Sequence, residues 1–172
     1  MRKFQVSIIG SSYEIDAEIE CAKQIGSYVA QNSWIGIHGG RGGVMRGFAQ
    51  GIAENNGTSI AILPGDNPEG ANEFSSIVIP AAIGHARNSL TGIAGDAIVV
   101  IGGGAGTLSE VCFAWIHNKP IVACAWLKGT SKNVAGTSID NRGLGPIKKA
   151  DCSEEVFQFL TACFKTWQNR KI

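Results

Sequence analysis

The sequence has little charge, and its charges do not cluster. Charged residues make up only 17% of its 172 residues, the formal net charge is +1, and no run of basic residues is longer than two. Such a pattern does not supply the electrostatic footprint of a nucleic-acid-binding protein. Because hydrophobic residues make up 44% of the chain, the composition also excludes disorder. We therefore expect a single domain over residues 1–172, with no nucleic-acid partner.

Long hydrophobic runs and cysteine motifs are missing as well. The apolar runs near residues 97–101 and 121–127 are far shorter than the ~20 residues that span a bilayer. The first residues lead into a strand pattern rather than a signal peptide. The five cysteines are widely spaced and form no CxxC pair, which indicates reduced thiols rather than a disulfide framework or a zinc site. The sequence therefore predicts a soluble cytoplasmic protein with no membrane partner and no metal site.

Two familiar nucleotide-binding motifs are absent, although glycine is abundant. No G-x-x-x-x-G-K-[ST] occurs, which argues against a P-loop NTPase, and no glycine cluster reaches the third glycine of the dinucleotide fingerprint. The 23 glycines are not spread as low-complexity sequence but gather directly after apolar runs.

Strand patterns alternate with helix patterns along the chain. Such alternation predicts an α/β, Rossmann-like, three-layer fold with a mostly parallel, doubly wound sheet. Ligands bind such sheets at the carboxyl ends of the strands, where the glycines lie. Residues 129–145 show no periodicity and are expected to form a flexible flap or lid. Strands are expected at 4–9, 34–38, 59–63, 76–79, 97–101 and 121–126, and helices at 15–29, 44–55, 83–94, 108–118 and 153–168.

The strongest candidate site is the loop after the expected strand 97–101. It contains Gly102, Gly103, Gly104 and Gly106, and a helix pattern follows. Glycine lets the backbone approach an anion closely, and the free N–H groups of the first helical turn then point at it. Thr107 adds a hydroxyl donor. A tight turn without a ligand is the alternative, but four glycines within five residues exceed what a turn requires, so we favour a phosphate-binding loop.

Glu110 allows two interpretations. Thr107-x-x-Glu110 is a capping-box pattern, in which the glutamate only accepts a backbone hydrogen bond. A carboxylate beside a phosphate site is otherwise unfavourable unless it contacts a sugar hydroxyl, an amine or a reacting centre. Both interpretations stay open at this point.

Two further loops repeat the arrangement of strand, glycine turn and helix. In the loop after the second expected strand, Arg41 favours an anion site because a guanidinium forks onto phosphate oxygens. The loop after the first expected strand is a weaker signal. The predicted ligand-binding residues of the loop after the second strand are Gly39, Gly40, Arg41, Gly42 and Gly43. Those of the loop after the first strand are Gly10, Ser11 and Ser12.

Arg87 precedes a helix pattern of small and apolar residues. It is either a further anion ligand or one half of a surface salt bridge, which is the more common role of an arginine. His38, His85 and His117 are expected to be packed or solvated histidines rather than catalysts.

Together these residues resemble the lonely guy superfamily, which also carries the label possible lysine decarboxylase. Its P-G-G-x-G-T-x-x-E signature is matched by residues 102–110, and Arg87 and Asp96 have the family spacing. The resemblance covers about residues 4–126. The chain has Gly102 in place of the signature proline, Asn88 in place of a lysine and Thr91 in place of a methionine. The resemblance implies a Rossmann-like homo-oligomer, either a dimer or a tetramer.

The phosphoribohydrolases of this superfamily hydrolyse the N-glycosidic bond of nucleoside 5′-monophosphates. For this chain the resemblance implies that Arg87 and Glu110 are catalytic. It also implies that the glycine loops hold the phosphate, with Gly103, Gly104, Gly106 and Thr107 in contact with it. It does not imply a lysine decarboxylase.

The molybdenum-cofactor carrier proteins form a second branch, which is similar in its Gly-x-Ala-Arg-Asn segment, in the position of Arg41 and in chain length. They bind an anionic pterin phosphate without a reaction. This similarity implies that Arg41, Arg87 and Asn88 bind the anion and that Glu110 serves in capping or in hydrogen bonding. No cofactor is required beyond a bound nucleotide or molybdopterin-type ligand. We favour the carrier over the hydrolase, and a nucleotide-sensing regulatory protein is the third alternative.

Overall fold

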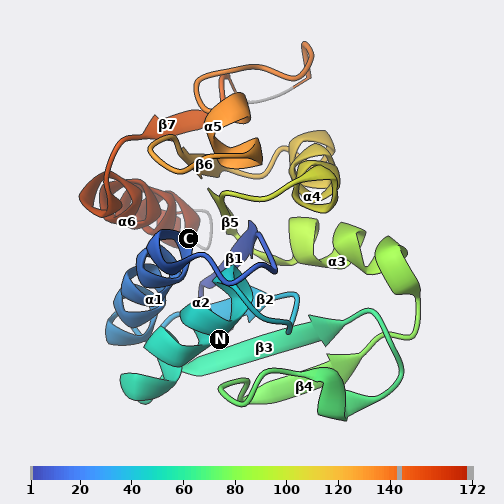
Figure 1. Ribbon diagram of the computed structural model, residues 1–172. Helices are drawn as coiled ribbons and strands as arrows, with labels where there is room; N and C mark the ends of the chain where they lie inside the picture. The colour runs from blue at the N-terminus through green and yellow to red at the C-terminus, as the bar shows by residue number, and fades with distance from the viewer. Residues whose placement is uncertain (1, 143–144, 170–172) are drawn as a thin grey trace.

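The computed structural model describes residues 2–142 and 145–169. Seven strands form one sheet (Figure 1). The strand order is β4-β3-β2-β1-β5-β6-β7, and all neighbouring strands are parallel. The prediction of an α/β, Rossmann-like fold with a doubly wound sheet is therefore confirmed. The strands are β1 (Gln5–Gly10), β2 (Ile35–His38), β3 (Thr58–Leu63), β4 (Ile77–Pro80), β5 (Ala97–Ile101), β6 (Ile121–Cys124) and β7 (Lys148–Ala150).

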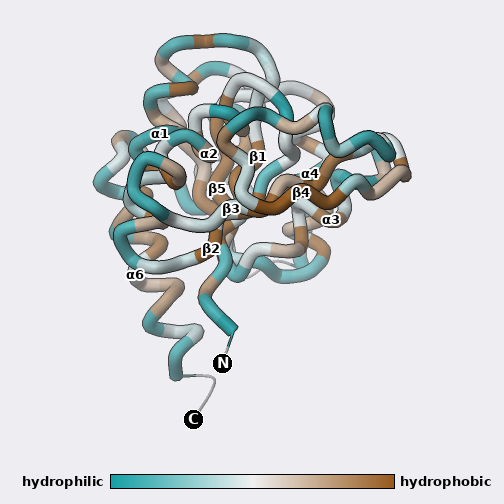
Figure 2. The backbone as a smooth tube through the Cα atoms, turned by 90° about the horizontal axis from the view of Figure 1, so that it is seen from below, coloured by the Kyte–Doolittle hydropathy of each residue, from teal (hydrophilic) through white to brown (hydrophobic). Residues whose placement is uncertain are grey.

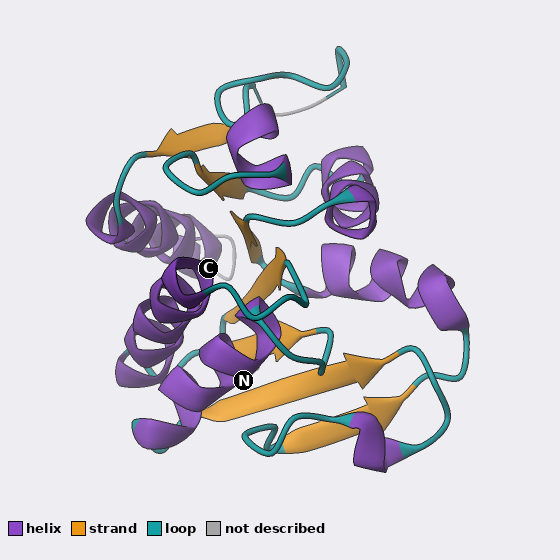
Figure 3. Cartoon of the chain, in the orientation of Figure 1, coloured by secondary structure: helices purple, strands orange, loops and turns teal. Residues whose placement is uncertain are grey.

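Helices cover both faces of the sheet and give three layers (Figures 1 and 3). On one face lie α1 (Asp16–Gln31), α2 (Val44–Glu54) and α6 (Ser153–Asn169), and on the other lie α3 (Arg87–Ala94), α4 (Ala105–Ile116) and α5 (Thr130–Val134). Two short 3-10 helices, Pro68–Gly70 and Gly84–Ala86, precede β4 and α3. None of the helices within the described ranges has the length and apolar character needed to cross a bilayer.

Two apolar clusters hold the layers together. One packs α1, α2 and α6 against the sheet, and the other packs α4 and the segment after it against the opposite face. All five residues of β5 are fully buried, as a strand covered on both faces requires. Figure 2 shows the hydrophobic residues along the strands inside the molecule and the hydrophilic ones on the outer loops.

The direction of the chain across the sheet reverses between β1 and β5. The chain runs outward from β1 to β4 and then returns to β5 on the other side of β1. The loops after β1 and β5 therefore leave toward opposite faces, which opens a crevice between them. Because Gly10 of β1 pairs with Ile101 of β5, both loops leave the sheet at the same level.

The segment 129–145 is not the structureless flap that its lack of periodicity predicted. Residues 130–134 form α5, and the chain then leads to the edge strand β7. A helix of five residues is too short to show a helical period, and β7 has three residues, of which two are exposed lysines. Residues 143–144 of the predicted flap lie outside the described residues.

Candidate functional site

A cleft with a volume of about 270 Å³ opens at the carboxyl ends of β1 and β5. This volume is near the lower end of the range typical of small-molecule sites, about 300–1,000 Å³. A larger hollow of about 410 Å³ lies beside α6 at the amino ends of the strands, but no predicted site residue lines it. The cleft is lined by Gly10, Ser11, Ser12, Tyr13, Arg41, Met45, His85, Arg87, Asn88, Gly104, Ala105, Gly106, Thr107 and Glu110.

The loop between β5 and α4 offers backbone N–H groups to this cleft. Gly104 is the N-cap of α4, and no side chain caps this end of the helix. The first N–H groups of a helix have no partner within the helix, and the helix dipole places a partial positive charge there. Gly104, Ala105 and Gly106 are exposed in the cleft, so this helix start is suited to an anion.

The rear of this loop is fastened by α5. The N–H groups of Ser131 and Thr130 donate to the carbonyl oxygens of Gly102 (3.0 Å) and Gly103 (2.8 Å). The N–H of Gly102 donates in turn to the hydroxyl of Ser131 (2.9 Å), and the Thr130 hydroxyl donates to the carbonyl of Gly104 (3.0 Å). Because residues of α5 donate hydrogen bonds to these carbonyl groups, the loop is held in one conformation. No sequence pattern indicated this support.

Gly102 leaves no room for a side chain. Its φ is +54°, and a Cβ added there would lie 2.1 Å from Oε1 of Glu18 in the first turn of α1. Glu18 is buried, burial raises its pKa, and its Oε2 has no hydrogen-bond partner among the described residues. A glycine at position 102 is therefore required by both the backbone conformation and the buried carboxylate behind it.

Glu110 does not cap α4. The helix begins at Ala105, so Thr107 is its third residue rather than its N-cap, and the capping-box interpretation is wrong. The carboxylate faces α3 instead, where Oε1 accepts hydrogen bonds from the Thr91 hydroxyl (2.5 Å) and from Nη1 of Arg87 (3.3 Å). Burial raises the pKa of Glu110 to about 7, against the lowering effects of Thr91 and Arg87. A carboxyl group with such a pKa can hold or release a proton near neutral pH.

Arg87 is a buried guanidinium with few partners. Only 8% of the residue is exposed, and Nε has no hydrogen-bond partner among the described residues. Its ion pair with Glu110, at 3.3 Å, is thus not the surface salt bridge that the sequence left as an alternative. A Cβ on Gly39 would lie 2.4 Å from Nη1, so Gly39 makes room for this side chain. Burial lowers the pKa of Arg87, Glu110 raises it, and the nearby positive charge of Arg41 lowers it further.

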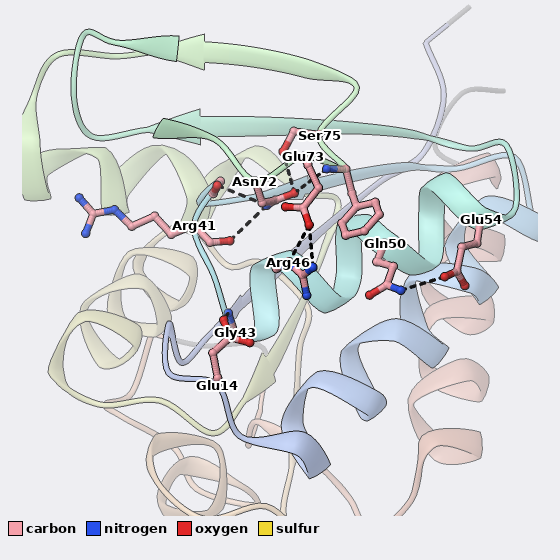
Figure 4. A network of polar contacts seen from close by, with 11 residues as sticks. Glu14, Arg41, Gly43, Arg46, Gln50, Glu54, Asn72, Glu73 and Ser75 are labelled. Atoms are coloured by element: carbon pink, nitrogen blue, oxygen red, sulfur yellow. Dashed lines mark hydrogen bonds and ion pairs between the residues drawn. The ribbon is translucent and has the colours of Figure 1, made fainter. Parts of the chain in front are cut away.

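Arg41 directs a second positive charge toward the cleft. Asn72 holds its backbone, since the Asn72 side-chain amide donates to the carbonyls of Arg41 (3.1 Å) and Gly40 (3.3 Å). The guanidinium extends away from this network (Figure 4), and no residue in the described ranges forms an ion pair or hydrogen bond with it. Two arginines therefore line one cleft, and only one of them has an acidic partner.

The chain itself accepts the first backbone N–H group at the start of α2. The N–H of Gly43, the N-cap of α2, donates to Oε1 of Glu14 at 2.9 Å (Figure 4). A carboxylate of the same chain thus accepts one of the N–H groups that were predicted to bind a ligand phosphate. This loop contributes Arg41 to the cleft rather than its backbone.

The remaining predicted polar residues fasten the walls of the cleft. The N–H of Tyr13 donates to the Ser11 hydroxyl (3.0 Å), and the N–H of Val44 donates to the Ser11 carbonyl (3.0 Å), which ties the first loop to α2. The side-chain amide of Asn88 donates to the Ser109 hydroxyl (2.9 Å) and to the carbonyl of Gly106 (3.4 Å), which ties α3 to α4.

The predicted site residues thus fall into two groups, and their contact with a ligand stays a prediction for both. Those that line the cleft are Gly10, Ser11, Ser12, Arg41, Arg87, Asn88, Gly104, Gly106, Thr107 and Glu110. Those that do not line it are Gly39, Gly40, Gly42, Gly43, Gly102 and Gly103, which shape the loops.

Sequence reasoning missed four residues of the cleft: Tyr13, Met45, His85 and Ala105. Each lies within two positions of a predicted residue in the chain. Their closeness to the glycine loops and to Arg87 was the available signal, because Ala105 and His85 stand only at variable positions of the motifs.

The sequence profile of the SLOG cluster4 family matches residues 3–155. The molybdenum cofactor binding protein from the phototrophic bacterium Rippkaea orientalis is 27% identical, and the superposition covers 95% of this chain and 99% of that chain with a TM-score of 0.83. The molybdenum cofactor carrier protein from Chlamydomonas reinhardtii is 26% identical, with 96% and 99% covered and a TM-score of 0.78. An uncharacterized protein of Archaeoglobus fulgidus is 33% identical over 123 residues, which cover 72% of this chain and 81% of that protein.

Proposed function

The chain belongs to the SLOG cluster4 family, and from this membership and the geometry of the cleft we propose that it binds a small phosphorylated ligand between β1 and β5. The start of α4 receives the phosphate together with Arg87 and Arg41. The other end of the ligand lies toward the mouth of the cleft.

The state of Arg87 carries this proposal. A buried charge is unfavourable unless it is paired and hydrogen-bonded. Arg87 makes one contact of 3.3 Å with Glu110, and its Nε has no partner among the described residues. A phosphate between Arg87, Arg41 and the N–H groups of α4 supplies the missing acceptors and separates two like charges. An anion therefore stabilises this arrangement.

The ligand that we favour is a pterin phosphate of the molybdenum-cofactor type. The similar proteins of Rippkaea orientalis and Chlamydomonas reinhardtii are described as binding or carrying the molybdenum cofactor. A carrier only has to hold and release its ligand, so Arg87, Arg41, Asn88 and the α4 amides suffice. Neither bond cleavage nor a further cofactor is required of the chain in this role.

The binding proposal is tested by calorimetry with a pterin monophosphate and with AMP. Replacing Arg87 by alanine removes charge-assisted hydrogen bonds, and we expect the affinity for a ligand that binds to fall by about 10- to 150-fold. Arg142→Ala is the matched control, because among the described residues Arg142 forms an ion pair with exposed Asp140, and it lies outside the cleft. Thermal melting checks that the Arg87→Ala variant is folded. Equal affinities for wild type and folded Arg87→Ala, or no binding of either compound to wild type, reject the proposal.

Hydrolysis of nucleoside 5′-monophosphates is the second candidate function, and the pKa of Glu110 favours it. A carboxyl group with a pKa of about 7 can accept a proton from water at neutral pH and return it to a departing base. In this reaction water adds to C1′, the C1′–N bond breaks, and ribose 5-phosphate and the protonated free base are released. Arg87 orients the substrate next to the carboxylate.

The two functions are separated by incubating the protein with AMP and measuring free adenine and ribose 5-phosphate. Turnover that disappears in Glu110→Gln while AMP binding persists identifies a hydrolase. Binding without turnover in wild type identifies a carrier or sensor. Turnover that persists in Glu110→Gln rejects Glu110 as the catalyst.

A further inference from the structure

Tyr13 exposes more of its surface than any other large apolar residue that the structure describes. It is 77% exposed and lines the cleft. Within the described residues its ring contacts no other aromatic ring and its hydroxyl forms no hydrogen bond. Aromatic rings contribute large apolar contacts and are usually packed, so an exposed ring on a residue that lines a cleft is available to a ligand.

The backbone beneath Tyr13 is firmly held. Its N–H donates to the Ser11 hydroxyl, and its carbonyl accepts from the N–H of Ile15 (3.1 Å). On the next residue, the Glu14 carboxylate accepts from the N–H of Gly43 (2.9 Å). The exposed ring therefore does not result from a loosely placed loop. A fixed backbone lowers the entropy that a ring loses when it binds a ligand.

The surroundings of Tyr13 suit a flat aromatic group rather than a second anion. Met45, which is buried, and His85, which is exposed, also line the cleft. Thioethers and aromatic rings both make favourable contacts with π systems. Arg41 can in addition stack its planar guanidinium on such a ring. Of the groups proposed to bind the phosphate, the start of α4 belongs to another element of the cleft, whereas Arg87 follows His85 by two residues, where the 3-10 helix Gly84–Ala86 meets α3.

We propose that Tyr13, Met45 and His85 form a ring subsite, which binds a flat aromatic heterocycle such as a pterin or purine, with Tyr13 as the stacking platform. The subsite rests on the proposed function, because the phosphate at Arg87 and α4 orients the rest of the ligand. Glu14 is a positioning residue for Tyr13. The chain accordingly distinguishes a phosphorylated heterocycle from a phosphorylated sugar of the same charge.

The test compares three ligands by calorimetry: AMP, 6-hydroxymethylpterin monophosphate and ribose 5-phosphate. Wild type is expected to bind at least one of the two heterocycles more tightly than ribose 5-phosphate. Tyr13→Ala is expected to weaken binding of that heterocycle by about 5- to 150-fold, the usual range for the loss of one aromatic stack, and to leave ribose 5-phosphate unchanged within about 2-fold. Tyr13→Phe keeps the ring and retains the affinity. Trp126→Ala, which removes an exposed aromatic residue outside the cleft, is the matched control.

The outcomes separate the subsite from the phosphate site. If wild type binds ribose 5-phosphate as tightly as both heterocycles, the phosphate site stands and the ring subsite is rejected. The subsite is also rejected if Tyr13→Ala weakens all ligands equally or none. If wild type binds none of the three ligands, the proposed function and the subsite fail together. Binding of ribose 5-phosphate checks that Tyr13→Ala is folded.

Discussion

Glu110 and Arg87 form a pair whose net charge depends on pH. Above about pH 7 the carboxylate is ionised and neutralises part of the charge of Arg87, whereas below this pH it is neutral and Arg87 remains fully available to an anion. The buried His38 does not interfere, since burial and Arg87 lower its pKa to about 4 and it stays neutral in this range.

We therefore predict that the affinity for a phosphorylated ligand falls as the pH rises from about 6.5 to about 8, by roughly 5- to 10-fold. The sign follows because protonation of Glu110 favours the anion. Calorimetry over this range measures the effect, and Glu110→Gln, which cannot ionise, should give a nearly flat profile. Parallel profiles for wild type and Glu110→Gln would show that another group, such as the ligand phosphate, is responsible.

Among the glycines of the β5–α4 loop, Gly102 and Gly104 should respond differently to substitution. Gly102→Ala places a side chain at φ +54° and against Glu18, so we predict a loss of about 1–3 kcal/mol in the free energy of unfolding. Gly104→Ala has no heavy atom within 4 Å of the new Cβ and a negative φ of −124°, although its ψ of −146° lies outside the usual β region, so its loss should be smaller, below about 1 kcal/mol. Urea unfolding compares the two, and equal losses would contradict this account.

At the scale of elements, the short helix α5 supports the candidate phosphate loop. Ser131→Ala removes the acceptor of the buried Gly102 N–H, so we predict a loss of about 1–3 kcal/mol in the free energy of unfolding and a weaker phosphate site. Lys132→Ala alters the next, exposed residue of the same helix and is the control. Urea unfolding and AMP binding provide the measurements. A stable Ser131→Ala variant with unchanged affinity would mean that the loop holds its conformation without α5.

Long elements could be predicted from the sequence, whereas short ones and helix ends could not. β5 is a run of five apolar residues between turn residues, and α1 repeats its apolar residues with a helical period, so both are visible locally. By contrast, α5 and β7 form through contacts with the β5–α4 loop and β6. The start of α4 was placed three residues late, at Leu108, because its first turn consists of small residues without an apolar pattern. That error kept the capping-box interpretation of Glu110 open.

The site was predictable to the same extent. Glycines after strands indicated the crevice between β1 and β5, because strand ends meet at one edge of a parallel sheet. The roles of individual glycines depend instead on distant contacts: Gly43 binds Glu14, Gly39 accommodates Arg87, and Gly102 faces Glu18. No local sequence pattern indicates these contacts.

For the whole molecule, the sequence comparisons confirm the resemblance to the lonely guy superfamily and its molybdenum-cofactor-carrier branch. The predicted homo-oligomer stays a prediction, and the β4 edge offers a surface for it. A Cβ on Gly36 of β2 would face α2. Because residues that pair across parallel strands lie on the same face, the register places Ile77 and Ile79 of β4 on the opposite face, that of α3. There they are 47% and 45% exposed.

We predict a dimer or tetramer in solution and a smaller species for Ile79→Glu, because a charge on this apolar face opposes its burial. Size-exclusion chromatography with light scattering measures the mass. Ile139→Glu changes a similarly exposed isoleucine elsewhere and is the control. A monomeric wild-type mass would contradict the prediction.

The pairing of Gly10 with Ile101 has a mechanical consequence. The two loops that leave at this level belong to different halves of the sheet, one formed by β1 to β4 with α1 and α2, the other by β5 to β7 with α4 to α6. A ligand held by Ser11 and Arg41 on one side and by the start of α4 on the other therefore ties the halves together above their seam. A ligand in the cleft would then slow the separation of β1 from β5. The protein would unfold most easily when the cleft is empty.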